Sequence, residues 1–364
     1  MPGRFPSPPE GSPPPPDGPQ QPSGYPPQPP GYPPGNQSQP PGYQPQATGH
    51  YPLDMNHLFE MTFSLFRFNS RRFLAMTFIV MIPVSLLLAA STVYTSDAAL
   101  DWIAQFQRLA SGGEISLSSF PWAVIGVGIL IGIVVGIGTY VAQAAVTHAA
   151  LNTYGGGKID ARSSARYALG RFGSLAGAYL LTFLAGVAIL VVGAMVATIL
   201  FLSTSSGGRI VPGIGVFLGL TVFVASFAAL IFISIRWALV IPTVVAEGAG
   251  ARKALGRSWR LVSGSSWRVL GYLLAFGLIF GLIAALLTLV ITLVVDPGSL
   301  AATSFTRPVD PVRVFIVNLG SGLIAALVLP FPAIGMTLLY LDLRWRRGEP
   351  VPQPGEAVPS PPAT

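Results

Sequence analysis

The chain contains no cysteine, which excludes disulfide bonds, thiolate nucleophiles and cysteine-ligated metals. Charge is scarce as well, because only 10% of the 364 residues are Asp, Glu, Lys or Arg, whereas a soluble domain averages about 25%. Of the three histidines, His148 has no second histidine or carboxylate at ligand spacing, so we expect a packed side chain there. Without a clustered set of acids, bases or metal ligands, the sequence predicts no catalytic residues, no metal and no cofactor.

Long apolar runs dominate what is present. Hydrophobic residues make up 51% of the chain, and several runs exceed the length of about 20 residues that crosses a bilayer as a helix. Only lipid solvates such runs, so the sequence predicts an all-α, polytopic membrane protein. We expect six transmembrane helices at 73–94, 120–150, 175–202, 214–246, 269–295 and 314–341.

A short basic stretch occurs twice and reveals a repeat. Residues 165–171, ARYALGR, match residues 251–257, ARKALGR. Around these copies we recognise three units of one design, in which a basic amphipathic interfacial helix precedes two spans joined by an external loop. Because each unit has two spans, successive units keep one orientation, which predicts parallel repeats. The units cover 54–150, 158–246 and 247–343.

The basic helix of the third unit has the clearest two-sided pattern. Its cations occupy one arc and its apolar residues the opposite arc, which is typical of a helix lying in the membrane interface. Each cation near an anionic leaflet gains about 1 kcal/mol, so contacts with anionic lipids are one interpretation. The alternative is that the cations only fix topology at the cytoplasmic surface. The candidate contacts are Arg166, Arg252, Lys253, Arg257 and Arg260.

Lys and Arg are distributed unequally between the two sides of the predicted spans. One side holds sixteen of them and the other holds four, Arg108, Arg209, Arg307 and Arg313. Basic loops stay in the cytoplasm, so we expect a multi-pass protein of the cell (plasma) membrane with both termini cytoplasmic. This placement also explains the net charge of +7 without a nucleic-acid partner.

Residues 1–52 differ sharply from the rest and carry 20 of the 35 prolines. Such a segment buries too little apolar surface to offset its ordering entropy, so we expect a disordered Pro/Gly/Tyr-rich cytoplasmic tail with polyproline II character. It is either a docking tail for a protein partner or a solvated tether. The predicted domains are therefore the tail at 1–52, a six-span membrane domain at 53–347 and a short disordered tail at 348–364.

The fourth apolar stretch, 214–246, is too long for a straight span. As one helix it would measure about 50 Å, against a hydrocarbon core of about 30 Å. Either the helix breaks at Pro242, or Arg236 lies inside the hydrocarbon. If the chain bends back at Pro242, Glu247 can meet Arg236, and we therefore mark Arg236 and Glu247 as a candidate buried pair. The alternative is that Arg236 snorkels to the interface.

Several short motifs resemble the membrane domain of some bacterial glycerophosphodiester phosphodiesterases. The resemblance covers about 54–347. It implies a stand-alone membrane module, because the His-Arg pair and the Glu-x-Asp metal pair of that family's catalytic TIM barrel are absent. The motifs are Leu65 to Asn69, Arg236 to Leu239, Pro242, Glu247-Gly248, Lys253 to Leu255, Arg257 to Trp259, Leu261, Gly264 and Tyr340 to Arg344.

Two functions from different classes fit these observations. The first is a non-enzymatic scaffold or sensor module that interacts with membrane lipids or envelope partners. The alternative is a small transporter or lipid-handling permease, whose path would need polar groups such as Gln143 and Asn318 within the spans. We expect these two side chains to hydrogen-bond across helices. Carboxylates are scarce in the spans, which argues against a proton relay.

Overall fold

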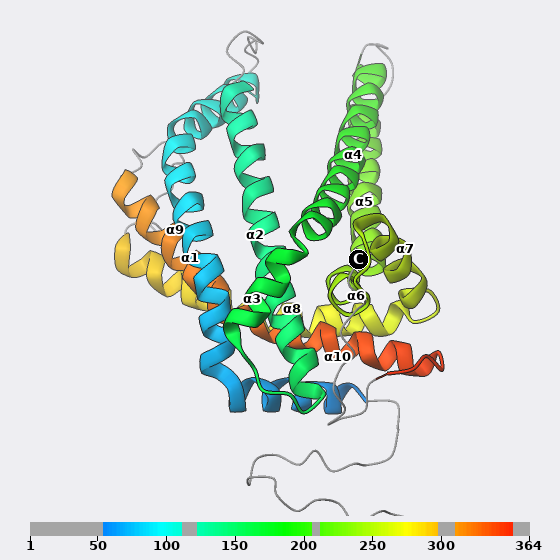
Figure 1. Cartoon of the computed structure of the whole chain (residues 1–364). Helices are drawn as coiled ribbons and strands as arrows, with labels where there is room; N and C mark the ends of the chain where they lie inside the picture. Colours follow the sequence, from blue (N-terminus) through cyan, green and yellow to red (C-terminus); the bar gives the residue numbers. More distant parts are fainter. Residues whose placement is uncertain (1–53, 111–121, 206–211, 298–309, 352–364) are drawn as a thin grey trace, which may run out of the picture. The chain divides into compact units, whose positions relative to one another are not determined.

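The computed structural model describes residues 54–110, 122–205, 212–297 and 310–351 (Figure 1). The chain divides into two compact units, residues 1–46 and 47–364, and every described residue belongs to the second. The predicted Pro-rich tail lies outside the described residues, so the predicted domain limits stay predictions. The described part is all-α, without a strand. Its helices are α1 (Met55–Ala110), α2 (Trp122–Tyr154), α3 (Ala161–Gly170), α4 (Phe172–Ser205), α5 (Pro212–Arg236), α6 (Val240–Glu247), α7 (Ala251–Val262), α8 (Ser266–Val295), α9 (Pro311–Val328) and α10 (Pro330–Arg346).

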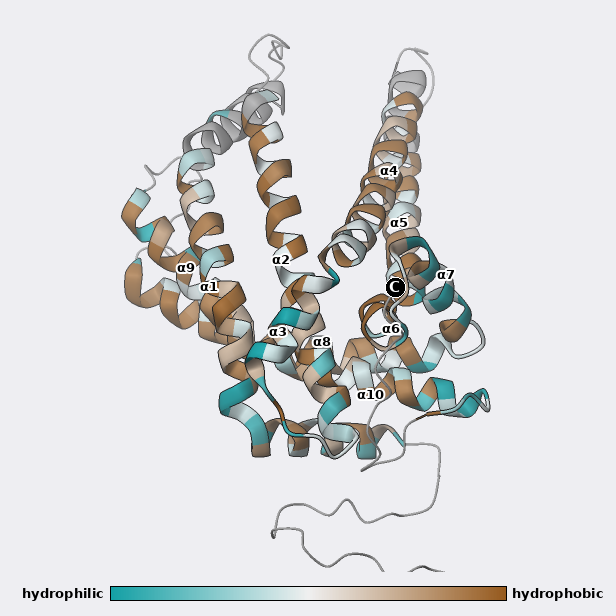
Figure 2. Ribbon diagram, in the orientation of Figure 1, coloured by the Kyte–Doolittle hydropathy of each residue, from teal (hydrophilic) through white to brown (hydrophobic). Residues whose placement is uncertain are grey.

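Six segments are long and apolar enough to cross a membrane, which confirms the predicted number of spans. Figure 2 shows that hydrophobic residues predominate along α2, α4 and α5. Side chains such as Leu190, Phe223 and Leu278 are more than half exposed, as expected for surfaces that lipid covers. The segments are Met55–Thr95, Val124–Tyr154, Phe172–Leu200, Phe217–Glu247, Ser266–Val295 and Pro311–Arg346.

Helix α1 joins two parts that the sequence suggested were separate. It kinks at Asn69, whose φ of −130° and ψ of 18° are not helical. Beyond the kink it runs without a further break to Ala110, so residues 97–110 continue α1 and do not form a separate helix. The residues before Asp97 are mostly polar, but Ser91, Thr92 and Thr95 donate to carbonyls one turn earlier in the same helix, and no proline or glycine interrupts it there.

Two predicted spans are broken rather than straight. The fourth ends as α5 at Arg236 and resumes as α6 at Val240. Pro242 therefore lies in the first turn of α6, where a missing amide proton is tolerated, and the break comes just before it. The sixth span is divided at Leu329 between α9 and α10, directly before Pro330. Proline favours both breaks, because it has no amide hydrogen to donate and its ring crowds the carbonyl one turn earlier.

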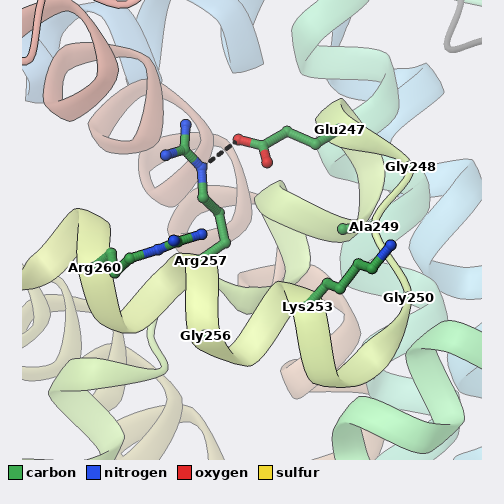
Figure 3. A pocket seen from close by; sticks show the side chains of 8 residues that line it. All are labelled: Glu247, Gly248, Ala249, Gly250, Lys253, Gly256, Arg257 and Arg260. Atoms are coloured by element: carbon green, nitrogen blue, oxygen red, sulfur yellow. Dashed lines mark hydrogen bonds and ion pairs between the residues drawn. The ribbon is translucent and has the colours of Figure 1, made fainter.

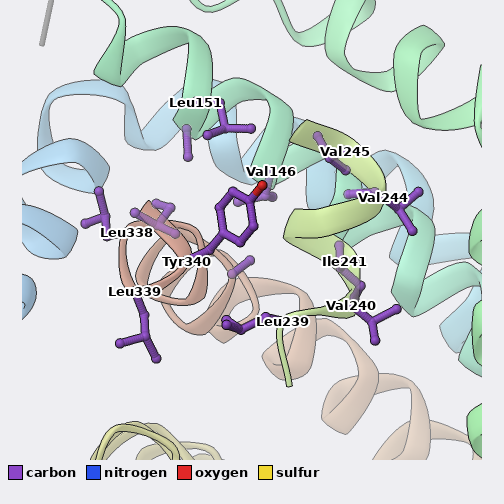
Figure 4. Close-up of a cluster of buried hydrophobic side chains, with 14 of the residues drawn as sticks. Val146, Leu151, Leu239, Val240, Ile241, Val244, Val245, Leu338, Leu339 and Tyr340 are labelled. Atoms are coloured by element: carbon purple, nitrogen blue, oxygen red, sulfur yellow. The ribbon is translucent and has the colours of Figure 1, made fainter. Parts of the chain in front are cut away.

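Figure 4 shows the part of the buried core in which α2, α6 and α10 meet; the core also includes residues of α1, α7 and α8. Residues 240–245 of α6 are all buried, so this short helix packs inside the protein and does not face lipid. Val146 of α2 and Leu338 of α10 pack in the same cluster. The core therefore gathers at one level of the molecule, while α4 and α5 extend away from it and pack mainly on each other.

The glycines at 128, 132 and 136 stand four residues apart on α2, a spacing that can let another helix approach closely. Only Gly136 meets a neighbouring helix closely, because a Cβ there would stand 1.9 Å from the Tyr179 ring of α4. The Tyr179 hydroxyl donates to the carbonyl of Gly132 at 3.1 Å, whereas Gly128 faces open space. The close approach of α2 and α4 is therefore confined to the inner end of the stripe.

Gly335 of α10 gives a test of this packing. A Cβ at Gly335 would lie 1.4 Å from the hydroxyl of Tyr272, a fully buried residue whose ring stacks on Phe276. We expect Gly335→Ala to destabilise the protein by about 1–3 kcal/mol through overpacking. Gly281→Ala on α8 is the matched control, because nothing lies within 4 Å of its added methyl group. Thermal midpoints in detergent would be compared, and equal midpoints for the two variants would contradict this packing.

Candidate functional site

Two glycines form the turn that leads into the basic helix α7. Gly248 ends α6 in the left-handed conformation, with φ of 64°, and Gly250 precedes the first turn of α7 without a side-chain cap. The carbonyl of Gly248 accepts a hydrogen bond of 2.8 Å from Nη1 of Arg171, the residue that closes α3. A Cβ at Gly248 would come within 2.9 Å of this guanidinium. The turn between α6 and α7 therefore requires glycine for both conformation and space.

One side of α7 packs against the protein. Ala254, Leu255, Ser258, Leu261 and Val262 are buried, and α7 contacts α4, α5, α6 and α10. The sequence interpretation that this apolar side rests in lipid was therefore wrong, because the bundle itself offers the apolar surface.

Ser258 accounts for the break in the fourth span. Its Oγ accepts from the Leu239 amide at 3.2 Å and donates to the Arg236 carbonyl at 2.9 Å. These are backbone groups that a continuous helix would have paired internally. The buried side of α7 thus replaces hydrogen bonds that the break removes.

The other side of α7 borders an open pocket of about 670 Å³ (Figure 3). Lys253, Arg257 and Arg260 recur at helical spacing along one stripe, so their side chains reach the same space. The turn before α7 supplies the remaining wall with its backbone. The lining residues are Glu247, Gly248, Ala249, Gly250, Lys253, Gly256, Arg257 and Arg260.

Arg257 is committed to the protein's own carboxylates. Its Nε donates to Oε1 of Glu247 at 3.0 Å, and its Nη2 pairs with Glu349, which follows α10. Tyr340 of α10 donates its hydroxyl to the same Glu247 oxygen at 2.8 Å, and Arg344 pairs with Glu349 at 3.1 Å. This network, which we call the α6–α7–α10 ion network, fixes the inner wall of the pocket.

Lys253 and Arg260 differ from Arg257 because their side chains have no carboxylate partner within the described residues. Both are exposed, and in the part of the chain that the structure describes their side chains make no ion pair or hydrogen bond. The backbone carbonyl of Arg260 does accept from Arg347, but this contact leaves its guanidinium free. The pocket therefore presents two uncompensated cations beside one that is neutralised.

The segment after α10 folds back onto α7. Gly348 adopts a left-handed conformation, with φ of 69°, and turns the chain so that Glu349 reaches Arg257. Arg347 donates to the Ser263 carbonyl at 2.8 Å at the end of α7, and Arg344 donates to the Pro350 carbonyl at 2.9 Å. Residues as far as Pro350 therefore make contacts with the last helix and with α7.

The surrounding charges shift the pKa values of this network. Partial burial raises the pKa of Glu349, but hydrogen bonds and charge from Arg257 and Arg344 outweigh burial and hold the pKa below its ordinary value. For Arg257 burial acts in the opposite direction and lowers the pKa. Hydrogen bonds and charge from Glu349 and Glu247 outweigh burial and raise the pKa above its ordinary value. Both groups are therefore held in their charged forms.

The structure brings together only part of the predicted site. Arg257 and two of the other candidate cations share the pocket, while Arg166 on α3 and Arg252 on α7 are exposed and do not line it. The predicted Arg236–Glu247 pair is not formed. The helix breaks at 237–239, and α7 then folds back so that Arg257 takes Glu247.

Sequence reasoning also missed Glu349, Tyr340 and Arg344. Glu349 is 92 positions from Arg257 and Tyr340 is 93 positions from Glu247, and no spacing rule connects residues so far apart. The one available signal was the Gly348 turn after a basic helix end, which is typical of a chain folding back.

The polar residues proposed for a transport path do not border the basic pocket. Asn318 donates to the Val314 carbonyl of its own helix at 2.9 Å, and so does not bond across helices as predicted. Arg236, Gln143 and Asn318 are all absent from the lining of the basic pocket. His148 stacks on Tyr167 with ring centres 4.1 Å apart, as a packed side chain does.

The position of the pocket can now be compared with known proteins. Residues 214–343 match the family model described as the membrane domain of glycerophosphoryl diester phosphodiesterase. The match confirms the resemblance over α5 to α10 and is to the membrane domain, not the catalytic domain. No curated protein and no solved structure matches the chain. The matched membrane domain contains every residue that lines the pocket, while Glu349 lies beyond it.

The ion network predicts a pH-dependent contribution to stability. We expect Glu349→Gln to cost about 1–2 kcal/mol at pH 7, because Arg257 and Arg344 lose a charged partner. The native pKa of Glu349 is lowered, so its contribution is complete above the ordinary Glu pKa of about 4.3 and is lost as the pH falls through the lowered value. Thermal midpoints of the wild type and the variant should therefore converge in acid.

The exposed Glu60→Gln serves as the control for this measurement, since within the described ranges the one ion pair of Glu60 is with His57. A difference between wild type and Glu349→Gln that stays constant from pH 7 to pH 3 would show that the carboxylate charge does not act through the network.

Proposed function

We propose that this protein is a non-enzymatic membrane module that binds phosphate-bearing anionic lipid headgroups at the α7 pocket. The observation that carries the proposal is the pair Lys253 and Arg260, two exposed cations that line one pocket and have no partner within the described residues. Arg257 stands between them but is neutralised by Glu247 and Glu349. The site is therefore built to hold Arg257 in place and leave charge for an external anion.

The chemistry of the lining favours a phosphate. Lys presents a compact ammonium with three donors, and the Arg guanidinium forks toward two oxygens of one anion. The family that the chain matches is named for an enzyme of glycerophosphoryl diesters, which are phosphodiester anions. This name supports the choice of a headgroup phosphate over a carboxylate ligand.

We further propose that the pocket faces the cytoplasm of a plasma-membrane protein, with both termini on that side. The support is the sixteen-to-four distribution of Lys and Arg. A cytoplasmic leaflet that carries anionic lipids would place headgroups beside α7.

The threefold repeat remains part of this proposal. Short helices α3 and α7 each precede a pair of spans, and the matched stretches 165–171 and 251–257 fall on them. Within these stretches Ala168 and Ala254 are both fully buried. Arg171 and Arg257, also matched, both contact the α6–α7 region. If the repeat is correct, α3 is a version of α7 whose basic end has become a structural support.

The proposal predicts a selective loss of headgroup binding. We expect Lys253→Gln/Arg260→Gln to bind short-chain phosphatidylglycerol roughly 30-fold more weakly than wild type, since each cation contributes about 1 kcal/mol. Binding would be measured on the detergent-solubilised full chain, with short-chain phosphatidylcholine as the zwitterionic reference.

Arg166→Gln/Arg252→Gln is the matched control, because it removes the same charge from exposed helical positions outside the pocket. It should leave binding within about twofold of wild type. Equal losses of affinity in the two double variants would mean that lipid responds to net charge and not to the pocket. No loss of affinity in either variant would also overturn the proposal.

The proposed orientation is tested separately. The chain has no cysteine, so single cysteines can be labelled without background. We expect Ser163→Cys on α3 to react with a membrane-impermeant maleimide only after cells are opened, and Ser206→Cys in the predicted external loop to react in intact cells. The reverse pattern would place the α7 pocket on the outer side.

A further inference from the structure

Arg236 ends the apolar helix α5 in an aromatic slot. Its Cζ lies 5.0 Å from the ring centre of Phe232, one turn earlier, and 5.2 Å from that of Trp259 on α7. The two rings meet edge to face, with centres 5.8 Å apart. The cation therefore lies beside two aromatic rings at once, which attract it but supply no counter-charge.

The charge of Arg236 is unmatched within the described residues. It forms no ion pair there, and its Nε and Nη1 are buried without a hydrogen-bond partner. The carboxylate that sequence reasoning assigned to it, Glu247, is occupied by Arg257 and Tyr340. The remaining nitrogen, Nη2, is not sealed in this way, so an external acceptor has one route to the guanidinium.

The surface beside this slot is apolar and open. Phe232 is 48% exposed and Trp259 is 38% exposed. Further back along α5, Phe223, Phe227 and Ile231 also point outward. Because α5 belongs to a membrane-spanning segment, this surface continues from Arg236 into the hydrocarbon. A cation thus lies at the end of a lipid-facing apolar strip.

We propose that Arg236, Phe232 and Trp259 form a lateral binding site for one phospholipid, whose phosphate pairs with Arg236 and whose acyl chain lies along α5. The phosphate of a phospholipid is an anion held at the depth where a span ends, so it suits a cation that the protein leaves unpaired. Neither Arg236 nor Trp259 lines the α7 pocket, and this site is independent of the proposed headgroup function.

The proposal predicts that one tightly held phospholipid is lost with Arg236. In native mass spectrometry of the full chain with added dioleoyl phosphatidylglycerol, wild type should retain one more lipid than Arg236→Gln. Arg252→Gln, an exposed cation of the same region outside the slot, should behave as wild type. Lys253→Gln/Arg260→Gln should also keep this lipid, which separates failure of this site from failure of the α7 pocket.

A second measurement covers the case in which Arg236→Gln does not fold. Brominated phospholipid should quench the fluorescence of Trp259 in the folded wild type, identified as the difference from Trp259→Phe. Brominated diacylglycerol, which lacks the phosphate, should quench it much less, and inorganic phosphate should not displace the phospholipid. Equal quenching by the two brominated lipids, or equal lipid retention in wild type and folded Arg236→Gln, would mean that Arg236 recognises no phosphate.

Discussion

The Arg257 guanidinium, held between the carboxylates of Glu247 and Glu349, is the contact on which the α7 region depends. It joins the end of α6, the middle of α7 and the segment after α10. Tyr340 and Arg344 bind the same two carboxylates, so removing Arg257 would leave partly buried negative charge without its main partner. Because Arg257 is spent on this internal role, its neighbours Lys253 and Arg260 are the ones available to a ligand.

The sequence was sufficient for the elements that depend on local pattern. Apolar length gave the six spans, and the basic stripe of α7 identified three of the residues that line the pocket. It was insufficient where tertiary contacts decide. The partner of Glu247 depends on where the fourth span breaks, and the choice of residues 237–239 over Pro242 follows from Ser258 binding the freed backbone groups. Glu349 carries no pattern that relates it to α7.

The α7 helix also shows how a membrane protein uses an amphipathic pattern in two ways. A helix with one apolar side can bury that side against lipid or against other helices, since both remove apolar surface from water. Here the bundle covers Ala254 and Leu261, while Trp259 stays at the surface beside Arg236. The same twelve-residue helix therefore borders a polar pocket, a packed core and a lipid-facing slot.

The return of Glu349 to Arg257 also sets an order of assembly. The two residues are 92 positions apart, and α8, α9 and α10 are synthesised between them. When α7 first leaves the ribosome, Arg257 has Glu247 nearby but not Glu349, and the end of α7 lacks the hydrogen bonds from Arg347. The wall of the pocket is completed only after the last two spans have entered the membrane. A chain whose final spans insert incorrectly would thus keep Glu247 as the partner of Arg257 but lack Glu349, and the end of α7 would stay without its contacts to the last helix.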